Sequence, residues 1–207
     1  MKQTIRYSVF SGRATLSARF GCVCLLTIVA SAAPACASNA NATFLMQTEA
    51  GELAPGGYLW DPLAALSGPM NMVVDLSSQK AFVYRNGKLI GITTISSGKP
   101  GYETPTGSFT VLEKDPNHRS TLYGAFCDSK NRIVRAGVSL EIDSAPSGTH
   151  FVGAPMLWFC RFYDGVGMHV GILPGYPASH GCVRLPANIA PLIYQKVKVG
   201  TPVEVDP

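Results

Sequence analysis

Short runs of apolar and β-branched residues, separated by turn residues, set the pattern of the chain from residue 71 onward. The first four runs cover residues 72–76, 80–84, 89–95 and 109–112. Asn86-Gly87 separates the second run from the third, and this dipeptide is typical of a type I′ hairpin turn because both positions need positive φ. Residues 96–107 contain three Gly and two Pro. The pattern therefore predicts strands, one tight hairpin and a long loop.

Residues 115–154 are polar and show no sustained period. They hold two short β candidates, 133–134 and 138–142. His118 and His150 also lie here, and neither has a partner at metal-ligand spacing. We therefore expect both histidines to be surface or loop residues.

The apolar content rises again at residues 155–162, which are predicted to form a core strand. Further along, apolar side chains at i, i+3 and i+4 spacing predict a helix over 188–196, and 203–205 is predicted to be a closing strand. Many short strands with one late helix indicate a mainly β fold. The expected architecture is a β-sandwich or barrel-like domain with one short C-terminal helix.

The N-terminal region has the features of a secretory signal peptide. The first nineteen residues hold four basic side chains and no acidic one: Lys2, Arg6, Arg13 and Arg19. The apolar residues 21–30 follow, and then Ala35-Cys36-Ala37, a small-residue cleavage pattern. The four basic residues equal the whole excess of 17 Lys and Arg over 13 Asp and Glu. The remaining chain is near neutral, so its charge gives no case for nucleic-acid binding.

These features predict a signal peptide at 1–37, a linker or N-terminal extension at 38–68, and one domain at 69–207. The extension is rich in Ala, Asn, Gly and Pro, although the apolar residues 58–60 are expected to pack onto the domain. The apolar run of the leader is too short for a comfortable membrane span, so no stable span is expected after cleavage. An alternative is a lipoprotein acylated at Cys36, which the small residue Ala33 disfavours.

Cleavage after residue 37 leaves three cysteines, Cys127, Cys160 and Cys182. An odd number in an oxidising compartment indicates an intermolecular bond or a reactive thiol. If Cys182 is the reactive thiol, Cys127 and Cys160 could form a disulfide or be two small buried side chains. The sequence leaves both alternatives open.

Reactive residue types gather in residues 168–186. This stretch holds two of the four histidines, one cysteine, and several Gly and Pro residues that break the backbone into turns. Reactive side chains on turns are typical of binding and catalytic sites. Cys182 can attack an acyl carbon as the thiolate, and either His169 or His180 could take its proton.

Two neighbours of the cysteine extend this chemistry. Gly181 permits a tight bend, and its own N–H and that of Cys182 could face a developing oxyanion. Arg184 could bind a carboxylate or form an ordinary surface ion pair. A structural half-cystine is the alternative for Cys182, but the flanking His, Gly and Arg and the odd cysteine count favour a nucleophile.

The segment Ser179-His180-Gly181-Cys182-Val183-Arg184 follows a His-bearing strand and Pro-Gly-Tyr-Pro-Ala, and resembles the signature of the L,D-transpeptidase (YkuD-type) family. Residues 97–100, Ser-Gly-Lys-Pro, and 104–109, Thr-Pro-Thr-Gly-Ser-Phe, resemble a second hallmark of these enzymes. The resemblance covers about residues 71–205. It implies a β-rich catalytic domain with its cysteine in a loop-lined cleft.

The resemblance also implies roles for individual residues. Cys182 would be the nucleophile and His169 the general base, oriented by the backbone carbonyl of Val170, where many members have Gly or Ser. The remaining motif residues would position the oxyanion or the substrate: Ser179, His180, Gly181 and Arg184. Family members require no metal and no organic cofactor.

The implied reaction is two-step acyl transfer on peptidoglycan stem peptides, which act as donor and acceptor. A terminal D-amino acid leaves, and the thioester passes to an amine of another stem or of a wall-attached protein. If water accepts the acyl group, the same site is an L,D-carboxypeptidase or endopeptidase. Such an enzyme acts after secretion across the inner membrane, in the periplasm or at the cell wall.

Two other classes of protein compete with this interpretation. A zinc site could use His169, His180 and Cys182, although the spacing contains no CxxC or HExxH pattern. The chain could also be a non-catalytic wall-binding β domain with a vestigial thiol. No residue type needed for the chemistry is missing, which favours the enzyme.

Overall fold

The computed structural model describes residues 49, 51, 53–61 and 67–207. The strands in chain order are β1 (Tyr58–Trp60), β2 (Met70–Asp75), β3 (Lys80–Arg85), β4 (Lys88–Thr94), β5 (Gly107–Thr110), β6 (Glu113–Asp115), β7 (Arg119–Cys127), β8 (Ile133–Ser139), β9 (His150–Pro155), β10 (Phe159–Tyr163), β11 (Val166–Val170), β12 (Val183–Leu185) and β13 (Pro202–Asp206). Within residues 67–207, α2 (Ala190–Lys196) is the only helix. No helix in the described part of the chain is long and apolar enough to cross a membrane. The predicted signal peptide and most of the predicted extension lie outside the described residues.

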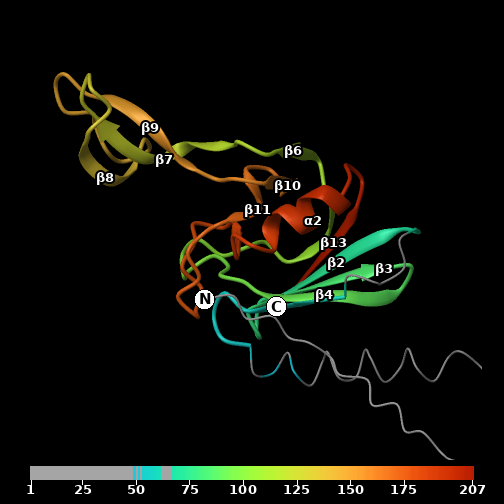
Figure 1. Cartoon of the computed structure of the whole chain (residues 1–207). Helices are drawn as coiled ribbons and strands as arrows, with labels where there is room; N and C mark the ends of the chain where they lie inside the picture. The colour runs from blue at the N-terminus through green and yellow to red at the C-terminus, as the bar shows by residue number, and fades with distance from the viewer. Residues whose placement is uncertain (1–48, 50, 52, 62–66) are drawn as a thin grey trace, which may run out of the picture. The chain divides into compact units, whose positions relative to one another are not determined.

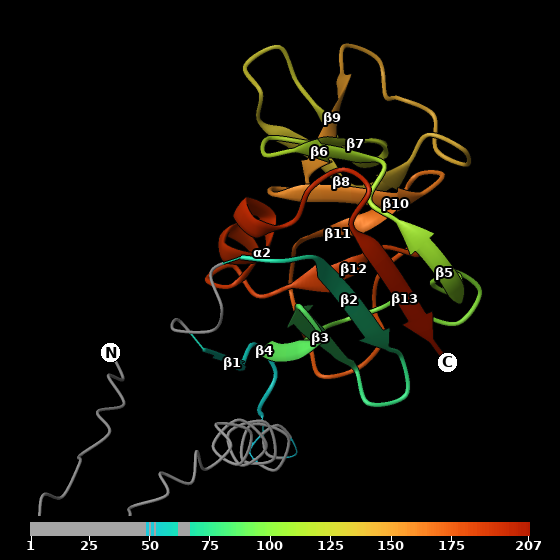
Figure 2. The same ribbon diagram turned by 90° about the vertical axis from the view of Figure 1, so that its right-hand side faces the viewer.

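The strands form three open sheets (Figures 1 and 2). The six-stranded sheet has the order β1-β4-β3-β2-β13-β5, the four-stranded sheet β12-β11-β10-β6, and the three-stranded sheet β8-β7-β9. In both views the four-stranded sheet lies between the other two. The first two sheets form a sandwich, so the mainly β prediction is confirmed as a sandwich rather than a closed barrel.

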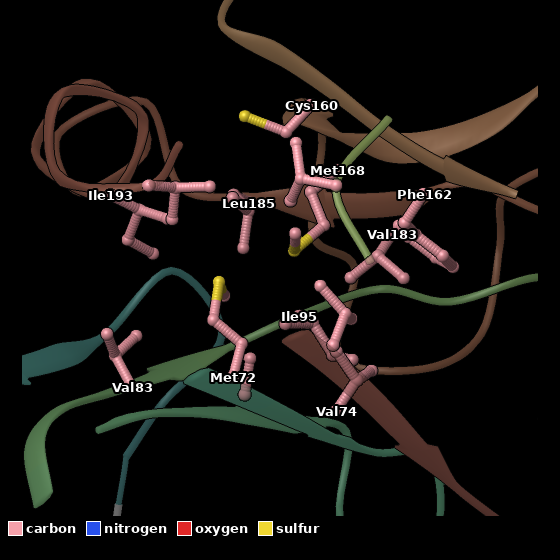
Figure 3. Packing of buried hydrophobic residues seen from close by; sticks show 14 of the residues in the cluster. Met72, Val74, Val83, Ile95, Cys160, Phe162, Met168, Val183, Leu185 and Ile193 are labelled. Atoms are coloured by element: carbon pink, nitrogen blue, oxygen red, sulfur yellow. The ribbon is translucent and has the colours of Figure 1, made fainter. Parts of the chain in front are cut away.

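The core of the sandwich follows from alternation along the strands. In β2, Met70, Met72 and Val74 are buried and their neighbours are half-buried, because successive side chains point to opposite faces. Figure 3 shows that such side chains from the six-stranded sheet meet those from β10 to β12 and from α2. Ile189 and Ile193 are each 1% exposed, and they attach α2 to this core.

The predicted hairpin and the predicted packing of residues 58–60 are confirmed. Asn86 and Gly87 both have positive φ, 50° and 72°, in the turn between β3 and β4. β1 adds to the free edge of β4, pairing Trp60 with Gly91. An added Cβ on Gly91 would lie 2.4 Å from the Trp60 ring, so glycine is required for the indole to lie against the strand.

The prediction of one core strand over 155–162 is wrong. β9 ends at Pro155, and Trp158 has a positive φ of 60° that interrupts the extended backbone before β10. β7 was not predicted at all. This nine-residue strand lies in the polar stretch 115–154, where the sequence shows no hydrophobic period. Its burial does not alternate cleanly, since half-buried residues occupy the middle of the strand on both faces.

Cys127 at the end of β7 and Cys160 in β10 are buried free thiols. They belong to different sheets, the three-stranded and the four-stranded one. The structure therefore favours two small buried side chains over a disulfide.

Candidate active site

A cleft of about 590 Å³ lies beside the signature segment. Its lining comes from β6, β7 and the turn between them, from β9 and β10, and from β11 and the residues around Cys182. Six of the seven predicted site residues line it: His169, Val170, Ser179, His180, Cys182 and Arg184. Gly181 is buried directly behind them.

Strand pairing brings the reactive side chains to one face. β11 and β12 are parallel, with Met168 opposite Val183 and His169 opposite Arg184. Side chains alternate along a strand, so Met168 and Val183 enter the core while His169 and Arg184 point to the other side. Cys182 is two residues before Arg184 and lines the same cleft. The fold thus joins residues that are thirteen apart in the sequence.

His169 is held as a neutral imidazole. Its Nδ1 donates a hydrogen bond to the backbone oxygen of Val170, at 2.7 Å, as the resemblance implied. Since a carbonyl only accepts, Nδ1 carries the proton and Nε2 has the free lone pair. Burial lowers the pKa of His169 from its ordinary 6.5 to about 4, and the nearby charge of Arg184 adds to this effect. The ring is therefore a base at neutral pH.

Cys182 rests as a thiol. Burial raises the pKa of its sulfur, while a backbone hydrogen bond at Gly167 and the positive charge of Arg184 act in the opposite direction. Its Sγ lies 3.9 Å from the backbone oxygen of Gly165, an acceptor that suits S–H. At neutral pH the cleft therefore holds a neutral thiol at Cys182 and a neutral imidazole at His169.

Ser179 ties the signature turn together. Its hydroxyl donates to the backbone oxygen of Cys182 and accepts the N–H of Gly181 at 3.1 Å. The N–H of Gly181, which the sequence suggested as an oxyanion donor, is therefore already engaged. The N–H of Cys182 has no acceptor in the described part of the chain.

His180 lies between two tyrosines. Its ring stacks on Tyr123 of β7, with centroids 4.3 Å apart, and meets the edge of Tyr102 at 4.7 Å. Burial lowers the pKa of His180, and the charges of Lys99 and Arg184 lower it further. This aromatic contact connects the signature segment to the three-stranded sheet.

Arg184 is half-buried, and no carboxylate pairs with it among the residues that the structure describes. Its aliphatic stem covers Gly171, where an added Cβ would lie 2.6 Å from the arginine Cγ. Its Nη1 lies 3.4 Å from the backbone oxygen of Ile172. The alternative of an ordinary surface ion pair is therefore wrong, and the guanidinium keeps its charge next to Cys182.

The sequence model described as YkuD, L,D-transpeptidase catalytic domain, matches residues 70–205. The chain belongs to this family. The match covers most of the chain and confirms the resemblance seen in the signature segment.

Individual relatives agree with this assignment. L,D-transpeptidase 1 of Mycobacterium tuberculosis is 26% identical over 133 residues, which are 64% of this chain and 49% of that protein. The chain thus spans about half the length of the curated relative it matches. A solved L,D-transpeptidase from Mycobacterium smegmatis aligns with a TM-score of 0.51 and 24% identity, covering 68% of this chain and 60% of that one. It shows that the fold is shared.

His118 lies in the loop between β6 and β7, as predicted, but the sequence did not indicate that it lines the cleft of this L,D-transpeptidase domain. His118 lines the cleft, stacks on Phe159 at 4.2 Å between centroids, and places Nδ1 3.3 Å from Asp115 Oδ2. β6 pairs with β10 and sets Asp115 opposite Phe159, which brings the histidine there. No sequence signal reports this long-range pairing. His150, in contrast, is exposed and contacts Asn131, as expected.

Thr104 is a second residue that the sequence did not single out, although it lies in the second hallmark segment. It is 2% exposed, and its hydroxyl donates to the backbone oxygen of Gly181 at 2.8 Å. It also accepts the N–H of Gly98 at 2.9 Å. The loop 96–106 is therefore bonded directly to the turn that carries Cys182.

Across the described residues, no three His, Cys, Asp or Glu side chains come together as a possible metal-ligand set. His180, one of the three ligands of the zinc alternative, stacks on Tyr123 and makes a T-shaped contact with Tyr102. The zinc alternative therefore lacks a ligand set in this cleft.

Proposed function

We propose that the protein is a peptidoglycan L,D-transpeptidase that works through a thioester on Cys182. The observation that carries the proposal is the common face of β11 and β12, where a buried neutral His169 and Cys182 border one cleft. Membership of the family supports the reaction class, and the geometry supports the residue roles.

The first step is acylation. His169 Nε2 takes the proton of Cys182, and Sγ attacks the carbonyl carbon between an L-centre and a terminal D-amino acid of the stem peptide. A C–S bond forms, the C–N bond breaks, and the leaving amine takes the proton from His169. The hydrogen bond from Nδ1 to Val170 keeps the ring in the tautomer that this transfer needs.

The second step resolves the thioester. An acceptor amine attacks the same carbon, a new C–N bond forms, the C–S bond breaks, and a proton of the amine returns to the sulfur. A second stem peptide would give a cross-link, and an amine of a wall-attached protein would give an attachment. Water in the same position would give L,D-carboxypeptidase or endopeptidase activity.

The charges of the cleft suit an anionic stem peptide. Arg161 and Arg184 both line it, and Glu113, the one carboxylate among the described residues of the lining, is bonded to Arg161 at 2.9 Å. Arg184 has no carboxylate partner in the residues described, so it is available to a substrate carboxylate.

The proposed location follows from the substrate. Peptidoglycan lies outside the cytoplasmic membrane, so the domain at 69–207 must be exported. The predicted signal peptide at 1–37 fits this requirement. We therefore place the mature protein in the periplasm or at the cell wall.

Intact mass spectrometry tests the proposal. The mature protein is incubated with a carbapenem, whose strained lactam carbonyl acylates a reactive thiol, and then with purified tetrapeptide muropeptides. We expect one covalent adduct that maps to Cys182 and is absent from Cys182→Ala. Dimeric muropeptides would establish transfer, and shortened monomers would establish hydrolysis. No adduct on a protein with a reduced thiol, together with unchanged muropeptides, would favour the wall-binding alternative.

A further inference from the structure

We propose that Thr104 is a positioning residue of this site. Its buried hydroxyl orients the peptide between Gly181 and Cys182 so that the N–H of Cys182, and not that of Gly181, receives the oxyanion. The inference rests on the proposed function, because an oxyanion arises only if Cys182 attacks a carbonyl carbon.

Both hydrogen-bonding directions of the Thr104 hydroxyl are used. Oγ1 donates to the backbone oxygen of Gly181 at 2.8 Å and accepts from the N–H of Gly98 at 2.9 Å. A hydroxyl has only one proton to donate, and the proton here is committed to Gly181. The side chain is 2% exposed, so water does not compete for these partners.

The direction of the Cys182 N–H follows from peptide geometry. The described peptide bonds are trans and planar, so the C=O of Gly181 and the N–H of Cys182 point in opposite directions. Thr104 holds the C=O in the protein interior and does not line the cleft, whereas Cys182 does. The N–H opposite Thr104 is thereby directed away from the interior, to the side where the sulfur lies.

Gly181 contributes its backbone conformation and not its N–H. Its φ is +109°, a conformation that residues with a Cβ rarely adopt. Space is not the reason for glycine, because an added Cβ would meet nothing closer than Val166 Cγ2 at 3.6 Å. Its N–H is bonded to Ser179 Oγ, which leaves one donor at this turn for the oxyanion.

The loop that carries Thr104 is itself bound to the signature segment. Gly98 and Ser179 form a parallel bridge, and Lys99 donates its N–H to the backbone oxygen of Ser179 at 3.1 Å. The loop is tightly curled, since an added Cβ on Gly98 would lie 2.0 Å from the backbone oxygen of Tyr102. The loop therefore holds Thr104 at a fixed position relative to the turn that carries Cys182.

Two reactions of the same sulfur separate positioning from simple structural support. Carbapenem acylation passes through an oxyanion, whereas alkylation by iodoacetamide displaces iodide at a saturated carbon and forms none. Thr104→Val keeps the shape of the side chain and removes the hydroxyl. We expect acylation to slow about 10- to 100-fold, somewhat less than the loss of a whole oxyanion donor. Alkylation should keep its wild-type rate, and Thr104→Ser should recover most of the acylation rate.

The outcomes distinguish the possible failures. Equal losses in the acylation and alkylation rates of Thr104→Val would show that Thr104 has only a structural role. An unchanged acylation rate in this variant would overturn the inference. If the wild-type protein is alkylated but not acylated, the proposed function fails first.

A measurement on the wild-type protein covers the case in which Thr104→Val does not fold. In the amide NMR spectrum of the carbapenem acyl-enzyme, the amide proton of Cys182 should move downfield as it binds the thioester oxygen. The amide of Gly181 should stay near its position in the free enzyme. A downfield shift of Gly181, or none at Cys182, would overturn the single-donor assignment.

Discussion

The sandwich and the three-stranded sheet β8-β7-β9 both border the cleft, but they are built differently. In the sandwich, Met72, Val74 and Val183 are 0% exposed, and the core includes residues from both sheets and α2. In the three-stranded sheet the buried apolar side chains are those of Phe126, Cys127 and Val138. The same sheet and its connections expose large apolar side chains, with Ile133 68% and Ile142 83% exposed.

The two regions therefore support different parts of the cleft in the L,D-transpeptidase domain. The proposed nucleophile and base are attached to strands of the sandwich, where dense packing fixes their geometry. The part of the cleft that β7 and β9 form belongs to a sheet with little core of its own, which we expect to open at a lower free energy than the sandwich. The contact between His180 and Tyr123 joins the two regions.

Truncating one buried phenylalanine in each region is the strongest test of whether the two regions differ in stability. Phe162 of the sandwich and Phe126 of β7 are 2% and 1% exposed. We expect Phe162→Ala to lower the free energy of unfolding by about 3–5 kcal/mol, because it leaves a cavity in the shared core. Phe126→Ala should cost less globally and mainly accelerate amide exchange in β7 to β9. Urea denaturation with hydrogen exchange measures both effects.

Ile142→Ala is the control for both truncations, and it should change the free energy of unfolding by no more than about 0.5 kcal/mol, since the side chain is exposed. If the two phenylalanine variants lose equal global stability, the two regions unfold as one unit and the comparison fails.

His169, on the sandwich side of the cleft, should dominate the pH dependence of the free energy of unfolding. The unfolded chain protonates His169 at an ordinary pKa of 6.5, whereas the folded protein does so at about 4. As the pH falls from 6.5 to 4, the unfolded state takes up the proton first, so stability decreases across this window. At about 1.4 kcal/mol per pH unit, the loss reaches about 3 kcal/mol.

Chemical denaturation of the wild-type protein and of His169→Gln at several pH values checks this expectation. The glutamine variant does not titrate, so its stability should vary less between pH 6.5 and 4. Parallel curves for the two proteins would show that other groups cause the acid sensitivity.

The smallest expected effect is at the contact that joins the regions. Tyr123→Ala removes the stacking on His180, and aromatic pairs of this kind contribute about 0.5–1.5 kcal/mol. We expect the second-order rate of carbapenem acylation to fall about two- to tenfold, with little change in thermal unfolding. Ile133→Ala, on the same sheet but outside the cleft, should leave the rate unchanged. Equal rates in both variants would contradict a role for this contact.

Local patterns in the sequence were enough to predict much of the sandwich. Short runs of apolar and β-branched residues located β2 and β3, and Asn86-Gly87 located the hairpin turn between β3 and β4, because each signal depends on neighbouring residues alone. The order of residue types around Cys182 likewise indicated the family. Signals of this kind can be read from the sequence because they depend only on residues that are close together in it.

Tertiary structure decided the features that depend on distant partners. β7 was missed because its residues face the cleft and two neighbouring strands, which removes a clean alternation. His118 enters the cleft only because β6 pairs with β10. Thr104 reaches the backbone oxygen of Gly181, 77 residues away in the sequence, because the loop that carries it pairs with the signature segment. A hydrogen bond forms only between groups that the fold brings within about 3 Å of each other. The separation of two residues in the sequence does not predict their distance in space.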